Sequence, residues 1–89
     1  SGVGEWARAK PRLARLAFAP DANLFYTAVY GAGLLRFDGD AAEARRCLEV
    51  LRKAQPDAPG TVELHAAVLD AEGKPAEAAA VALKYAGDD

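Results

Sequence analysis

The 89-residue sequence is poor in the side chains that enzymes and metal proteins use most. It has one cysteine, Cys47, one histidine, His65, and no methionine. A single cysteine excludes an internal disulfide framework, and no second histidine or cysteine is spaced to share a metal with His65. Neither residue has a nearby partner for nucleophilic chemistry, so both are expected to pack. We expect no enzymatic activity, no metal and no cofactor.

Long apolar runs and an excess of basic charge are also absent. No stretch approaches the roughly 20 apolar residues of a membrane-spanning helix, and a formal net charge of −2 gives no overall field for nucleic acid. The absence of a visible signal peptide favours a cytoplasmic location. The chain begins Ser1-Gly2 without methionine, which suggests a segment excised from a larger protein; a signal sequence removed in this way would leave no trace.

Alanine is the most abundant residue, with 22 copies, whereas isoleucine is missing. Alanine has the highest intrinsic helix propensity, and strands usually need β-branched side chains. The composition therefore predicts an all-α fold.

An internal repeat organises most of the chain, and its period is the separation between Gly39 and Gly73. The same offset matches further pairs: Thr27 with Thr61, Leu35 with Leu69, and Glu43 with Glu77. The two units are residues 21–56 and 57–89, and each is expected to be a helix, a short turn and a second helix. The predicted helices are 24–37, 41–54, 61–71 and one from Pro75 to about Tyr85.

Local signals set these boundaries. Asp21 or Asn23 can cap the first helix, and Asp40 with Glu43 forms a variant of the capping box. Gly39 and Gly73 are suited to the left-handed residue that ends a helix.

Residues 1–20 are expected to be an N-terminal capping segment. Pro11 interrupts the helical pattern, so we predict a helix over 12–19 and a frayed or separate turn over 5–10. This segment carries a net charge of +3 and residues 57–89 carry −5, so the molecule is electrically polarised. The stripe formed by Arg8, Arg12 and Arg15 is expected to be a solvated helix face; the alternative is an electrostatic contact with an acidic partner surface or with the acidic end of a second copy.

The repeat resembles the tetratricopeptide repeat family over roughly residues 25–86. The family's turn glycine matches Gly39 and Gly73, and its closing proline matches Pro56. Small residues where the helices cross correspond to Ala32 with Ala66 and, early in the second helix, to Ala44 with Ala78. The resemblance implies an α-solenoid fragment of about five helices. It also implies a concave groove, lined by the first helix of each repeat, that holds a peptide or protein segment.

The candidate binding residues come from the first and third predicted helices. They are Tyr26, Val29, Tyr30, Gly33, Arg36 and Phe37, together with Glu63, Ala67 and Asp70. On a helical wheel Tyr26, Tyr30, Gly33 and Phe37 share one stripe, which either lines the groove or packs against the N-terminal helix. Phe25 is assigned to packing. Glu63 and Asp70 either attract a Lys or Arg of the partner or form a solvated acidic face.

The expected function is a scaffold that recognises a protein or peptide. The alternative is a self-assembly or spacer domain, in which copies of the chain stack through their open ends and opposite charges.

Overall fold

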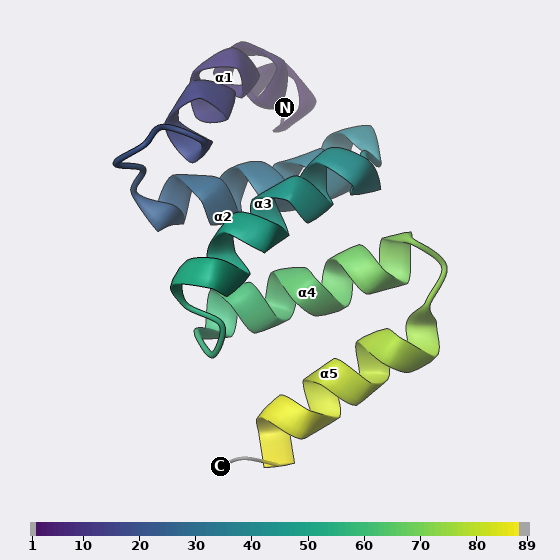
Figure 1. Cartoon of the computed structure of the whole chain (residues 1–89). Coiled ribbons are helices and arrows are strands. Elements are labelled where there is room, and N and C mark those ends of the chain that lie inside the picture. The colour runs from purple at the N-terminus through teal and green to yellow at the C-terminus, as the bar shows by residue number, and fades with distance from the viewer. Residues whose placement is uncertain (1, 88–89) are drawn as a thin grey trace.

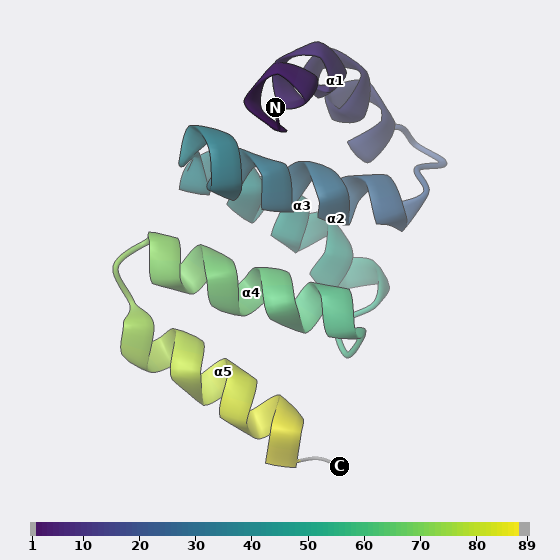
Figure 2. The same ribbon diagram turned by 180° about the vertical axis from the view of Figure 1, so that it is seen from behind.

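The computed structural model describes residues 2–87, all of whose regular structure is helical. In chain order the elements are α1 (Gly2–Ala17), α2 (Leu24–Gly33), a π-helical segment η1 (Leu34–Asp38), α3 (Ala41–Ala54), α4 (Pro59–Ala71) and α5 (Pro75–Gly87). The helices stack in chain order from α1 at one end to α5 at the other, with α2 and α3 crossing in the middle (Figures 1 and 2). The prediction of an all-α fold with about five helices is confirmed.

The helix boundaries follow the capping signals. Asn23 Oδ1 accepts a hydrogen bond from the Phe25 amide at 2.9 Å, and Asp40 Oδ1 accepts one from the Glu43 amide at 3.1 Å. Gly39 and Gly73 have φ angles of 62° and 80°, left-handed values that glycine adopts without a side-chain clash. α3 has the predicted bounds, the predicted helix 24–37 is divided between α2 and η1, and α4 begins two residues early at Pro59.

The predicted break at Pro11 is wrong, because α1 runs through it from Gly2 to Ala17. Contacts with the rest of the fold hold the half of α1 that was expected to fray. Trp6 is 7% exposed, and its indole Nε1 donates a 3.0 Å hydrogen bond to Asp38. Lys10 Nζ lies 2.6 Å from the same carboxylate. The hydrogen bonds from Lys10 and Trp6 lower the pKa of Asp38.

Where α1 meets α2 and η1, the core is a cluster of aromatic rings that packs against a glycine. The Trp6 ring is stacked with Tyr30 and Phe37, with centroid distances of 6.0 and 5.6 Å. Gly33 lies beneath it, and a Cβ built there would be 2.2 Å from the Trp6 ring. A side chain at position 33 would therefore displace α1.

Where η1, α3 and α4 meet, the core is aliphatic. Leu34, Leu48, Leu51 and Val68 are fully buried, and Cys47 lies among them. The expected crossing at Ala32 is not observed, since Ala32 is exposed. The close approach is instead at Gly31, where an added Cβ would be 2.9 Å from the Leu64 side chain.

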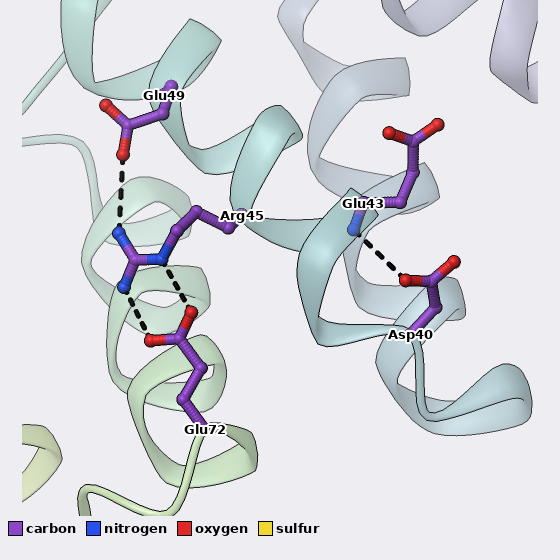
Figure 3. A network of polar contacts seen from close by, with 5 residues as sticks. All are labelled: Asp40, Glu43, Arg45, Glu49 and Glu72. Carbon is purple, nitrogen blue, oxygen red and sulfur yellow. Dashed lines mark hydrogen bonds and ion pairs between the residues drawn. The ribbon is translucent and has the colours of Figure 1, made fainter.

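Acidic residues before the two turn glycines connect each turn to an earlier helix. Asp38 binds α1 as described above, and its counterpart in the second repeat, Glu72, binds Arg45 of α3. The Arg45 guanidinium contacts both Glu72 oxygens, at 2.7 and 2.8 Å, and also reaches Glu49 at 3.3 Å (Figure 3). Both carboxylates therefore orient the helix that precedes them against an earlier helix.

Two threonines at equivalent positions differ in their hydrogen bonding. Thr27 and Thr61 are 0% and 1% exposed. The Thr27 hydroxyl donates a 2.8 Å hydrogen bond to the Ala17 carbonyl, whereas the Thr61 hydroxyl has no hydrogen-bond partner among the described residues.

We expect Thr27→Val to lower the free energy of unfolding by about 1–2 kcal/mol, because it removes the hydrogen bond and leaves a buried carbonyl unpaired. Thr61→Val should be neutral or stabilising by up to about 1 kcal/mol, because it replaces an unpaired buried hydroxyl with a methyl group. Urea denaturation followed by circular dichroism measures both values. Equal losses in the two variants would contradict the difference in bonding.

Candidate functional site

A groove of about 580 Å³ lies between α2 and α4. The two helices run in the same direction, so both walls present their N-terminal ends at one end of the groove (Figures 1 and 2). Its lining residues are Phe25, Ala28, Val29, Ala32, Leu35 and Arg36 from α2 and η1, and Gly60, Glu63, Leu64, Ala67, Asp70 and Ala71 from α4.

Most of the lining is apolar and open to solvent. Phe25 is 66% exposed and Val29 is 36% exposed. The assignment of Phe25 to packing is therefore wrong: it follows the capping residue Asn23 in the first turn of α2, where no other helix covers it. Its ring meets Tyr26 edge-on at 5.7 Å. Small side chains at Ala28, Ala32 and Ala67 leave room between the walls.

Charged residues lie along both walls. Arg36 is on the first wall, and its counterpart in the repeat, Asp70, is on the second with Glu63. The Arg36 guanidinium is 5.4 Å from the centroid of the Phe37 ring. None of the ion pairs within residues 2–87 involves Glu63 or Asp70. Both carboxylates are therefore available to a cationic group on a ligand.

The structure brings only some of the predicted binding residues into the groove. Val29, Arg36, Glu63, Ala67 and Asp70 gather in the groove.

The aromatic stripe lies elsewhere. Tyr30 is 4% exposed, Phe37 is half-buried, and both are stacked on Trp6 above Gly33. For these three residues the packing alternative is the observed one. Tyr26 is half-buried and does not line the groove.

Sequence periodicity did not separate these two faces because α2 is apolar on both. Residues 25, 28, 29, 32 and 35 recur at helical spacing just as the aromatic stripe does. A decision between them requires knowing which face α1 covers.

The thiol of Cys47 and the imidazole of His65 are outside the groove. Cys47 is buried, and burial raises the pKa of its thiol to about 12, which keeps it protonated and unreactive. His65 is half-buried and lines a different cavity. Within residues 2–87 no three His, Cys, Asp or Glu side chains are grouped so as to hold a metal ion.

Comparisons with known protein families, with curated proteins and with solved structures found no match to this chain. None of the described helices is long and apolar enough to cross a membrane.

The two phenylalanines test the assignment of the faces. We expect Phe25→Ala to change the free energy of unfolding by less than about 0.5 kcal/mol, because the ring is exposed. Phe37→Ala should cost about 2 kcal/mol or more, because it removes the ring stacked on Trp6. Thermal and urea denaturation measure both changes. A larger loss for Phe25→Ala would show that its ring belongs to the core.

Proposed function

We propose that this chain is a tetratricopeptide-like scaffold that binds a peptide or protein segment in the groove between α2 and α4. The observation that carries the proposal is the groove itself, in which an exposed aromatic ring and small side chains along the walls lie beside two carboxylates without ion-pair partners in residues 2–87.

Equivalent positions of the two units support the repeat assignment. Leu34 and Val68 are both fully buried, and Ala44 and Ala78 are both buried. The left-handed glycines, Gly39 and Gly73, also occupy equivalent positions. In a helical-repeat scaffold each unit packs on the next, and the surface along equivalent helices is used for binding.

The chemistry of the groove defines the ligand. An apolar side chain of the ligand would fill the space between Phe25 and the alanines, where burial of apolar area provides affinity. A Lys or Arg beside that anchor would meet Glu63 or Asp70, which would fix the register of the segment and favour basic ligands. We therefore propose a segment with one large apolar residue flanked by basic residues.

An array of short synthetic peptides tests this proposal. Each peptide carries a central Leu, Phe or Trp, flanked by Lys and Arg in one set and by Asp and Glu in the other. We expect the labelled protein to bind the basic set, and binding to weaken as salt rises because ions screen the charges. Ala32→Gln should abolish binding by filling the groove, whereas Ala42→Gln, on an exposed position of α3 outside the groove, should bind as the parent chain does.

The charge contribution is tested separately with Glu63→Gln and Asp70→Asn. Each should weaken binding of the basic peptides by roughly threefold, as expected for one partly solvated ion pair. Circular dichroism confirms that the variants keep their helicity. Equal binding of both peptide sets, or full binding by Ala32→Gln, would contradict the groove as the binding site.

Self-assembly is a second candidate function, and the exposed surface of α5 favours it. Leu83 is 72% exposed and Tyr85 is 40% exposed, whereas Leu51, the counterpart of Tyr85 in α3, is fully buried. The proposed occupant of this surface is a second copy of the chain. The net charges of +3 in residues 1–20 and −5 in residues 57–89 favour contact between opposite ends of two copies.

Light scattering over a range of protein concentrations tests this alternative. Assembly would give a mass that rises from 9.3 kDa with concentration. The increase should disappear on Leu83→Glu and diminish at high salt. A constant mass at all concentrations would contradict assembly.

A further inference from the structure

A second cavity, of about 260 Å³, lies where the C-terminal end of α3 meets α4 and α5. It shares no lining residue with the groove. Its polar lining includes Arg52 of α3, His65 of α4, and Lys84 and Tyr85 of α5, and its apolar lining includes Val62 and Val81. Three nitrogen-bearing side chains from three different helices therefore surround one recess.

The course of α5 accounts for the position of the cavity. α4 and α5 diverge with distance from the turn that joins them (Figures 1 and 2). The cavity is lined by the N-terminal half of α4 and the C-terminal half of α5, where this separation is wide.

The preceding part of the chain provides an internal comparison. One repeat period earlier in the chain, the positions that correspond to His65, Lys84 and Tyr85 are Gly31, Val50 and Leu51, and the position that corresponds to Arg52 is Phe18 of the N-terminal segment. These counterparts have no polar side chains: Leu51 is fully buried, and the Phe18 ring meets Tyr30 edge-on at 6.0 Å. Apolar residues pack at these earlier positions, whereas the later ones place polar and cationic groups around an open cavity. Packing within the repeat does not explain that change of chemistry.

The electrostatics of the cavity favour an anion. Arg52 and Lys84 contribute two positive charges and Asp57 one negative charge, and none of the ion pairs within residues 2–87 involves any of the three. Burial, followed by the positive charges of Arg52 and Arg45, lowers the pKa of His65, although Glu49 and Glu72 oppose this effect. His65 is therefore neutral at pH 7 and can donate one ring N–H.

We propose that this cavity binds a carboxylate carried on a small apolar or aromatic group. The Arg52 guanidinium offers paired donors to the two carboxylate oxygens, and Lys84 adds a second cation. Val62, Val81 and the Tyr85 ring provide apolar surface for the rest of the ligand. At neutral pH the lining has a surplus of one positive charge, which matches a monoanion, and Asp57 opposes a dianion.

The imidazole proton signals of His65 provide a direct readout, because it is the only histidine in the chain. The probe is sodium benzoate, titrated into the full chain at pH 7 and followed by NMR, with benzamide and sodium chloride as matched controls. We expect saturable shifts with benzoate, about tenfold weaker binding of neutral benzamide, and a rise in the pKa of His65 when the anion is bound.

Variants locate the binding site. Arg52→Gln and Lys84→Gln should each weaken benzoate binding by about tenfold. Lys53→Gln, which removes the same charge from a neighbouring exposed position outside the cavity, should leave it unchanged. All three positions are exposed, and circular dichroism checks that the fold is retained.

Three results would overturn the proposal. Equal shifts with benzoate and benzamide would show an apolar recess without anion recognition. Tighter binding of inorganic sulfate, a dianion at pH 7, than of benzoate in the same titration would show a site for dianions. Equal affinity of Arg52→Gln and Lys53→Gln for benzoate would show that benzoate binds elsewhere, or that its affinity depends only on the net charge of the protein.

Discussion

Close helix approach at α2 is the constraint on which the rest of this structure depends. α2 contacts α1, α3 and α4, and two glycines let side chains reach its backbone. The Trp6 ring lies over Gly33, and Leu64 lies against Gly31. A Cβ at either position would require neighbouring atoms to move, because protein interiors have little free volume. These contacts place α1 on one face of α2 and leave the opposite face as a wall of the groove.

The polar contacts around this core act mainly through geometry. Asp38 joins the end of η1 to α1, and Glu72 joins the end of α4 to α3. Ion pairs at such partly exposed positions contribute little net stability. They do restrict how each helix lies against an earlier one, and the paired bonds between Arg45 and Glu72 have a defined geometry (Figure 3). The contact of Arg45 with Glu72 lies directly after α4, the helix that forms one wall of the groove.

The two recesses differ in chemistry although both lie between helices of the same stack. The groove is mostly apolar and carries Glu63 and Asp70 with one arginine, Arg36. The cavity beside α5 carries Arg52 and Lys84 with one aspartate, Asp57. The ligands proposed for the two recesses therefore differ in charge: a basic, apolar segment for the groove and a small carboxylate for the cavity.

The sequence by itself determined the helical class, the turns at Gly39 and Gly73 and the capping by Asp40, and it limited the cap of α2 to Asp21 or Asn23, because these features depend on propensities and hydrogen bonds within a few residues. It also identified five of the residues that line the groove.

Only the tertiary structure decided three further features. α1 continues through Pro11 because Trp6 and Lys10 hold its N-terminal half. Tyr30, Gly33 and Phe37 pack against α1 and Phe25 is exposed, because α1 covers one of two apolar faces that periodicity cannot distinguish. The cationic cavity brings together residues from three helices, and no local pattern records their spatial proximity.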